Sequence, residues 1–313
     1  MSPTRQRILL ATGVLGLAGL GLWLALRPAS PSAPAPAAAV PAVAAAPLHP
    51  DVLAVLESPP GIASRAGLIL ARRLPRTLSD PDIEALGRWL RAPVPAGRTV
   101  DTHASFFNEV CNALGRQPGG LPAPIAADLL AIHADPASLD VLRDYALQHL
   151  GTACLRTARD PATAFPSVTV IQRLRAATGE GADVATAPTH TWSGTALNML
   201  DLLSREGIPD APSSDWIASR AHALATAPDT CEHTRISAYG MLARRHSGSA
   251  LAQARTLAAD AARSVMLRLA ALNYIGTCGD PAADRPLLDT FSTSSDERLA
   301  FASREARQQL SKK

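Results

Sequence analysis

One ten-residue pattern recurs along this 313-residue chain and limits its fold more than any other feature. Residues 143–152 read RDYALQHLGT and residues 268–277 read RLAALNYIGT, so that Arg, Ala, Leu, an apolar residue, Gly and Thr coincide in register. Parts of the pattern recur at residues 106–115, 235–244 and 298–307. Neighbouring copies lie about 30–36 residues apart, a spacing typical of stacked supersecondary units.

The repeated unit predicts a helix that ends in a sharp turn. Its apolar residues lie at helical spacing and form one stripe along the helix: Leu269, Leu272 and Ile275. Gly276 permits a left-handed cap at the C-terminal end of that helix, and Asp280 followed by Pro281 suits the start of the next one. The pattern therefore indicates pairs of helices joined by short turns.

The composition favours helices throughout the region after residue 50. That region is rich in Ala, Leu and Arg, which are good helix formers, and only 4% of the whole chain is aromatic. One short strand-like run, PSVTVIQRL at residues 166–174, fits the start of a helix equally well. We therefore predict an all-α domain over residues 51–313.

The repeated residues resemble the second helix and the following turn of the HEAT-like repeat family. The resemblance rests on Arg268, Ala271, Leu272 and Gly276, and on the turn at residues 279–281, which reads GDP. It implies a HEAT-like helical-hairpin solenoid, in which each repeat packs against its neighbours and an extended face is left for binding. Membership of this family implies binding to other proteins more often than catalysis.

The resemblance is uneven along the chain. It is fair over residues 214–311, weaker over residues 104–155 and poor over residues 156–213. Gly, Thr and Pro interrupt that middle stretch at residues 178–191 and 208–213. The expected solenoid is therefore irregular in the middle.

An uncharged segment near the N-terminus, residues 8–26, predicts one transmembrane helix. At a rise of ~1.5 Å per residue it spans roughly 28 Å, about the thickness of a hydrocarbon core. Because Arg5 and Arg7 precede it, the positive-inside rule places residues 1–7 in the cytoplasm and exports everything after Arg27. The alternative is a cleaved signal peptide, which also exports the domain.

Residues 27–50 are predicted to be a linker, because they are almost entirely Pro, Ala and Ser. Such a stretch holds no helix and favours extended, polyproline-like structure at ~3.1 Å per residue, which reaches up to ~70 Å. The expected location is the bacterial inner membrane, crossed once through residues 8–26, with the domain at residues 51–313 in the periplasm.

The charge distribution argues against nucleic acid as a partner. The chain carries 30 Lys and Arg against 27 Asp and Glu, a net charge of +3. Arg5, Arg7 and Arg27 account for that surplus, since no acidic residue precedes Asp51. The domain is therefore balanced, whereas binding to a phosphate backbone requires a basic surplus.

An even number of cysteines in an exported domain predicts two disulfides, formed by Cys111, Cys154, Cys231 and Cys278. Three connectivities are open, and pairing of neighbours along the chain closes two loops of similar length. In a regular solenoid, however, Cys231 and Cys278 would lie ~20 Å apart, so either that bridge does not form or the helix order differs. Four buried, reduced thiols are the alternative.

The sequence contains none of the familiar motifs of phosphate-binding loops, zinc proteases or serine hydrolases. We therefore predict no catalytic, cofactor-binding or metal-binding residue. Three polar groups are compatible with chemistry but fit helix starts or turns better: Cys231–Glu232–His233, Asp101 with His103, and His133 with Asp135.

Two tryptophans near the irregular middle, Trp192 and Trp216, are the binding anchors that the sequence offers, although burial in the core suits them better. We therefore expect a membrane-anchored periplasmic scaffold or adaptor that binds another protein and needs no cofactor. Two alternatives stay open. One is an exported enzyme or enzyme subunit with a site that the sequence does not reveal, and the other is an inhibitor or immunity-type binding protein.

Overall fold

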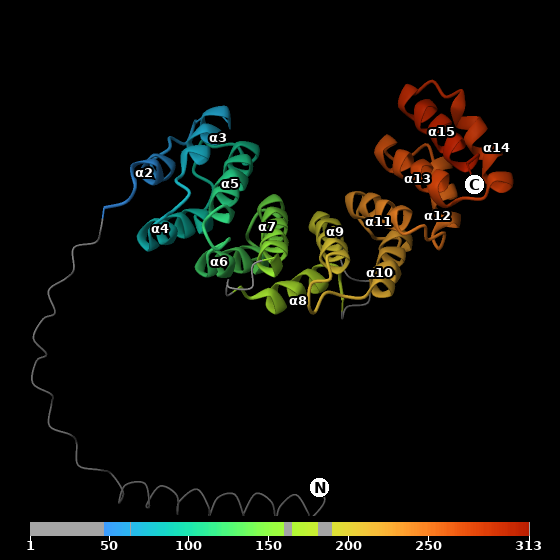
Figure 1. Cartoon of the computed structure of the whole chain (residues 1–313). Helices are drawn as coiled ribbons and strands as arrows, with labels where there is room; N and C mark the ends of the chain where they lie inside the picture. The colour runs from blue at the N-terminus through green and yellow to red at the C-terminus, as the bar shows by residue number, and fades with distance from the viewer. Residues whose placement is uncertain (1–46, 63, 160–164, 181–189, 313) are drawn as a thin grey trace, which may run out of the picture. The chain divides into compact units, whose positions relative to one another are not determined.

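The computed structural model describes residues 47–62, 64–159, 165–180 and 190–312. This part of the chain consists of fourteen α-helices, labelled α2 to α15, joined by turns and short loops, with no β-strand (Figure 1). The predicted all-α class is therefore confirmed. The strand-like run at residues 166–174 lies almost wholly within a helix, α8 (Ser167–Ala177).

The predicted transmembrane segment, residues 8–26, and most of the linker, residues 27–50, lie outside the described residues. None of the helices in the described part is both long and apolar enough to cross a bilayer. Residues 46–313 form one compact unit.

The helices alternate between two sets. The first set is α3 (Ser64–Arg73), α5 (Val100–Gly115), α7 (Asp140–Arg159), α9 (Thr191–Arg205), α11 (Glu232–Arg244), α13 (Val265–Cys278) and α15 (Glu297–Leu310). The second set is α2 (Pro50–Leu56), α4 (Asp80–Arg91), α6 (Ala123–Ala134), α8, α10 (Ser214–Thr226), α12 (Leu251–Ala259) and α14 (Pro281–Ser292).

Each helix of the first set packs on the next member of that set, so that α3, α5, α7, α9, α11, α13 and α15 form a continuous row (Figure 1). From α6 on, each helix of the second set packs against the row helix that follows it. The principal contacts of every helix are therefore with helices one or two positions away along the chain. This is the pattern expected of stacked helical hairpins.

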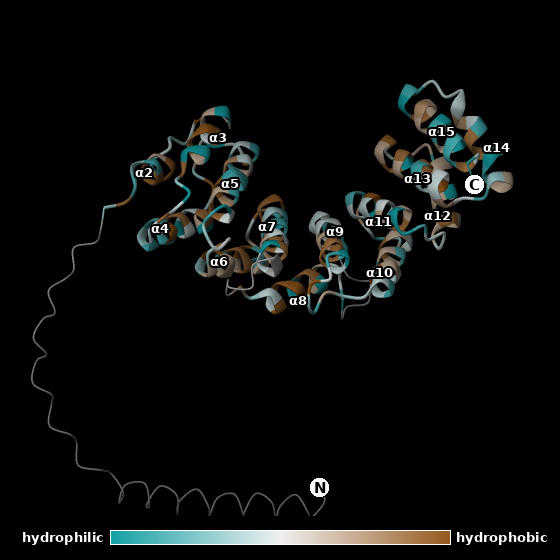
Figure 2. Ribbon diagram, in the orientation of Figure 1, coloured by the Kyte–Doolittle hydropathy of each residue, from teal (hydrophilic) through white to brown (hydrophobic). Residues whose placement is uncertain are grey.

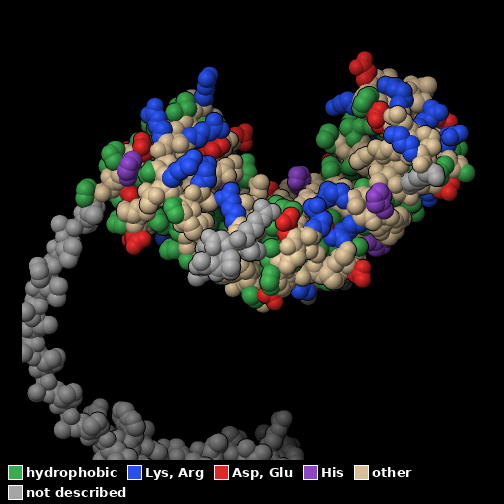
Figure 3. Space-filling view, viewed as in Figure 1, with side chains coloured by type: hydrophobic (Ala, Val, Ile, Leu, Met, Phe, Trp, Pro, Cys, Tyr) green, Lys and Arg blue, Asp and Glu red, His purple; other side chains and the backbone are tan. Residues whose placement is uncertain are grey.

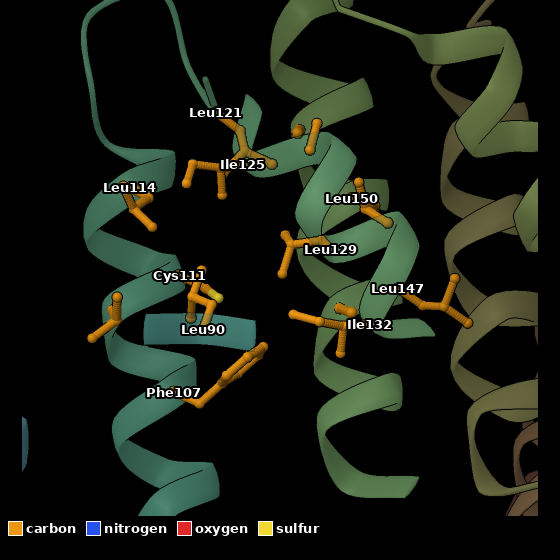
Figure 4. Packing of buried hydrophobic residues seen from close by; sticks show 14 of the residues in the cluster. Leu90, Phe107, Cys111, Leu114, Leu121, Ile125, Leu129, Ile132, Leu147 and Leu150 are labelled. Carbon is orange, nitrogen blue, oxygen red and sulfur yellow. The ribbon is translucent and has the colours of Figure 1, made fainter. Parts of the chain in front are cut away.

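The core runs along the row as two adjoining clusters of buried side chains, which meet near α9. Most helices carry both hydrophobic and hydrophilic residues, as helices with one buried face do (Figure 2). In the first cluster, Phe107 and Leu114 of α5 point toward side chains of α6 and α7, among them Leu129 and Leu150 (Figure 4). All four are fully buried, and truncation of such a side chain to Ala costs ~2–5 kcal/mol.

The arginine of the repeated pattern has the same role in three hairpins. It reaches from the start of a row helix to a carbonyl oxygen at the end of the preceding helix, where the carbonyls have no partner within their own helix. The three bonds join Arg143 Nε to His133 O (2.9 Å), Arg235 Nη2 to Ala227 O (2.6 Å) and Arg268 Nε to Ala258 O (3.0 Å). In the last copy Arg298 instead forms an ion pair with Asp296.

Gly276 does not cap a helix, contrary to the sequence prediction. Helix α13 continues past it to Cys278, and Gly279 is the C-cap, with an extended backbone. A Cβ atom at position 276 would lie 2.6 Å from the Cα atom of Ala306 in α15. The glycine is therefore required for the close approach of two row helices. Asp280 and Pro281 do start the next helix as predicted, since the Asp280 side chain accepts bonds from two amides of α14.

Candidate functional site

A small polar cavity lies between two neighbouring row helices, α5 and α7. Its volume is about 140 Å³. Its polar lining comes from both helices: Asn108, Asn112, Gln148, His149, Thr152 and Arg156. Because residues three or four apart share one face of a helix, the spacing of these residues turns all of them toward the same gap.

The imidazole of His149 is fixed on one wall of this cavity. Its Nε2 lies 2.9 Å from Oδ1 of Asn108, which only accepts, so that Nε2 carries the proton and donates. Burial, and secondarily the nearby Arg156 guanidinium, lowers the pKa of His149 to about 4. His149 is therefore neutral at pH 7, and Arg156 supplies the only formal charge among the residues that line this cavity.

Cys111 also lines the cavity. Burial raises the pKa of its thiol well above the ordinary range. The thiol therefore stays protonated at neutral pH, whereas a cysteine nucleophile acts as the thiolate.

A larger open basin, with a volume of about 380 Å³, adjoins the cavity and shares Gly115 and Arg156 with it. Arg76, Arg116, Gly119 and Gly120 are also part of its lining. Among the residues that line the basin or the cavity, all of which the structure describes, there is no Asp or Glu. The site is therefore positively charged.

Gln117 holds the two loops of the basin together. Its side-chain oxygen accepts a 2.9 Å hydrogen bond from the backbone N–H of Leu78, and its amide nitrogen donates to the carbonyls of Pro75 and Ala113 at 3.1 and 3.2 Å. The side chain is 8% exposed. These bonds fix the backbone next to Arg76 relative to the end of α5, where Arg116 is the C-cap.

The three arginines of the basin differ from many other arginines of this protein in having no ion-pair partner in the described part of the chain. At least eleven arginines elsewhere form ion pairs with Asp or Glu. Within the described residues, Arg76, Arg116 and Arg156 form none, although Arg156 donates to the carbonyl of Gly115 at the end of α5. Basic side chains are grouped over α3 and α5 on the face shown in Figure 3.

The tryptophans that the sequence offered as binding anchors serve in packing. Trp192 is only 3% exposed and lies stacked on His190, with ring centroids 3.9 Å apart. The guanidinium carbon of Arg143 lies 4.0 Å from the centre of its ring. Trp216 is half-buried, packs against both core clusters and lies 5.1 Å from the guanidinium of Arg175.

No disulfide joins the four cysteines, all of which are described, so the predicted bridges are absent from the structure. The Cys231 sulfur lies 3.3 Å from Thr234 Oγ1 at the start of α11, and that of Cys278 lies 3.9 Å from Leu242 O near its end. About ten residues of helix separate these positions, ~15 Å, whereas a disulfide needs Cα atoms within ~7 Å. This separation agrees with the expectation from the sequence that Cys231 and Cys278 lie too far apart to pair in a regular solenoid.

Cys111 and Cys154, the other predicted pair, are fully buried thiols of the first core cluster. Burial raises the pKa of Cys154 to about 11. Both residues occupy core positions of row helices, where a thiol packs as a small apolar side chain.

The three polar groups that the sequence analysis considered as candidates for chemistry lie at helix starts and turns. Cys231 is the N-cap of α11 and Glu232 its first residue. Thr99 caps α5, so Asp101 lies in its first turn, while His103 is buried beside Trp89. Asp135 accepts a bond from the amide of Ala137 in the turn after α6. The described residues contain no cluster of three His, Cys, Asp or Glu that could hold a metal ion.

Comparison of this chain with protein-family models, with curated proteins and with solved structures finds no match. The resemblance to HEAT-like repeats therefore stays a prediction from the repeated residues.

The basin was not foreseen from the sequence, although a signal for it exists. Arg76, Arg116 and Arg156 are spaced at equal intervals of forty positions. The first two follow the ends of α3 and α5, and the third lies near the end of α7. Equal spacing along a stack of helices places equivalent side chains next to one another.

Proposed function

We propose that this protein is a membrane-anchored periplasmic adaptor, built as a HEAT-like helical-repeat solenoid, that binds another protein. The observation that carries the proposal is the polar cavity between α5 and α7, with its adjoining basic basin, on a row of stacked helices. Stacked helical repeats typically leave such inter-helix grooves for binding partners. The HEAT-like assignment is supported by the shared role of the three repeat arginines.

The chemistry of the lining suits binding better than catalysis. Asn108, Asn112, Gln148 and Thr152 offer hydrogen-bond donors and acceptors of the kind that recognise peptide groups and side chains. The one thiol in the lining, that of Cys111, is held protonated by burial. An adaptor uses groups of this kind without altering the partner.

The location is supported by the sequence of the first 50 residues. The uncharged run at residues 8–26 supplies a membrane anchor, and the Pro- and Ala-rich residues 27–50 supply a spacer. A spacer of this length holds a binding domain away from the bilayer, where it can reach a partner. Protease treatment of spheroplasts tests the topology, because residues 51–313 should be degraded without lysis of the inner membrane.

The binding function is tested by affinity capture from detergent-solubilised membranes after crosslinking in cells. The informative variant is Thr152→Phe, which fills the cavity. Its matched control is Thr290→Phe, on α14, because each threonine hydroxyl donates to the carbonyl four residues earlier, at 2.8 Å for Thr152 and 3.1 Å for Thr290.

We expect one protein to be recovered with the natural sequence and with Thr290→Phe, and to be lost with Thr152→Phe. Recovery of no protein above background with the natural sequence would contradict the adaptor function. Equal recovery of the partner with the natural sequence and both variants would leave the adaptor function standing but would show that the partner binds outside the cavity.

A further inference from the structure

We infer that the basin of Arg76, Arg116 and Arg156 binds an acidic peptide segment of the partner, with the partner's carboxylates on these arginines. The inference rests on the proposed function, because it names the chemistry of the partner at the same site. It is carried by three guanidinium groups around one basin that form no ion pair with a carboxylate of the described residues.

The charge of the basin is a local property. The domain has as many basic as acidic side chains, and at least eleven of its arginines are paired with a carboxylate. Three like charges around one basin repel one another, and the repulsion is relieved when an anion binds. Such a cluster therefore favours a ligand that carries more than one negative charge.

The basin is also preorganised. Gln117 ties the loop next to Arg76 to the end of α5, and the Arg156 guanidinium is held against the Gly115 carbonyl. A site whose loops are already fixed loses less conformational entropy on binding than a flexible one. Arginine is also the side chain best shaped for a two-bond contact with a carboxylate.

The neighbouring cavity favours a peptide over an isolated small anion. Asn112, Gln148 and Thr152 lie beside the basin and offer uncharged hydrogen-bond donors and acceptors. Carboxylates in the basin and peptide groups along the cavity together match an extended acidic segment. A nucleic acid is disfavoured, because the described residues include one lysine, Lys312, at the C-terminal end, and the domain has no basic surplus.

The test uses the full chain in detergent and a short fluorescent peptide of alternating Glu and Ser, measured by fluorescence anisotropy. The variants are Arg76→Gln, Arg116→Gln, Arg156→Gln and the triple variant. The control is Arg285→Gln, which removes one positive charge from an exposed position on α14. Thermal unfolding of each variant shows that the fold is kept.

We expect each basin variant to weaken binding roughly tenfold, which corresponds to the loss of one charged contact. The triple variant should lose binding, while Arg285→Gln should bind as the natural sequence does. A peptide of alternating Gln and Ser should bind far more weakly, and affinity for the Glu peptide should fall as salt is added.

Three results would overturn the inference: no binding of the Glu peptide, equal binding of the Gln peptide, or equal loss in Arg285→Gln. Inorganic phosphate is also compared with a free carboxylate as a competitor of the Glu peptide. Complete displacement of the peptide by phosphate at a far lower concentration than the carboxylate requires would overturn the inference in favour of a phosphate site.

Affinity capture separates this inference from the proposed function. Recovery of one partner equally well with the natural sequence and with the triple variant would reject the acidic segment and leave the adaptor function standing. Recovery of no partner with either chain would reject the adaptor function itself.

Discussion

Arg255 of α12 donates two hydrogen bonds, of 2.6 and 3.0 Å, to the carboxylate of Asp284 in α14. The carboxylate side chain is fully buried and also accepts a 2.8 Å bond from the backbone N–H of Asp280. The pair thus joins two successive hairpins of the stack. Arg245 of α11 and Asp201 of α9 form a similar link earlier in the row.

We predict that Asp284→Asn lowers the free energy of unfolding by about 2 kcal/mol, because it removes the charge of a fully buried carboxylate that accepts hydrogen bonds from the partly exposed Arg255. Chemical denaturation followed by circular dichroism measures the change. The control is Asp289→Asn, whose pair with Arg307 is nearly half-exposed and so contributes less than ~1 kcal/mol. Equal effects of the two substitutions would contradict the assignment of Arg255 and Asp284 as a link between hairpins.

Two glycines in row helices should respond to alanine in opposite ways. Gly276→Ala should destabilise the protein by roughly 1–3 kcal/mol, because the new Cβ would overlap the backbone of Ala306. Gly240→Ala should leave stability unchanged or raise it by up to ~1 kcal/mol, because its Cβ would lie 3.6 Å from the flexible side chain of Arg244. Thermal unfolding distinguishes them, and a neutral Gly276→Ala would disprove the close approach of α13 and α15.

The absence of disulfides predicts the outcome of thiol counting. Alkylation of the unfolded protein with iodoacetamide, without reductant, should add four groups by mass spectrometry. In the folded protein at pH 8, Cys111 and Cys154 should react slowly, because both are buried and burial raises the pKa of both thiols. Fewer than four groups on the unfolded chain would show that a bridge forms after all.

Stability should fall as the pH is lowered through the range in which histidine titrates. Burial lowers the pKa of His103, His133 and His149 to about 4, from 6.5. Below pH 6.5 the unfolded chain therefore binds protons that the folded chain does not, so each residue's contribution is complete above pH 6.5 and is lost toward pH 4. The loss is ~3 kcal/mol for each histidine at most.

His103 provides the variant for this prediction. Neither ring nitrogen of His103 has a hydrogen-bond partner among the described residues, and the ring lies beside Trp89 and the charged Arg98. His103→Phe should therefore match or exceed the stability of the natural sequence at pH 7 and lose less stability at pH 5. Denaturation at the two pH values measures this, and an unchanged pH dependence would contradict it.

The helical class and the hairpin pairing were predictable, because both depend on patterns local in the sequence. Apolar residues at helical spacing and the residues Asp280 and Pro281 indicate where a helix lies and where the next one starts. The arginine of the repeat was visible too, but its hydrogen bond to a preceding helix end was not. That bond depends on how two helices pack.

Three features depended on distances between helices, which cannot be read from local patterns in the sequence. Glycine at position 276 gives the same sequence signal whether it caps a helix or admits a neighbouring one. Cysteine count and compartment suggested disulfides, but the positions of Cys231 and Cys278 at opposite ends of α11 exclude their bridge. The basin joins arginines from three helix ends, which only the stacking brings together.

The central claim is that a protein partner binds at the cavity between α5 and α7, and crosslinking in living cells tests it most directly. A photoreactive amino acid is placed at the position of Gln148, which is exposed and lines the cavity, or at the exposed position of Arg285 on α14. The account predicts one strong adduct from position 148, lost when Arg76, Arg116 and Arg156 are replaced by Gln, and none from position 285. No adduct from position 148, or the same adduct from both positions, would contradict it.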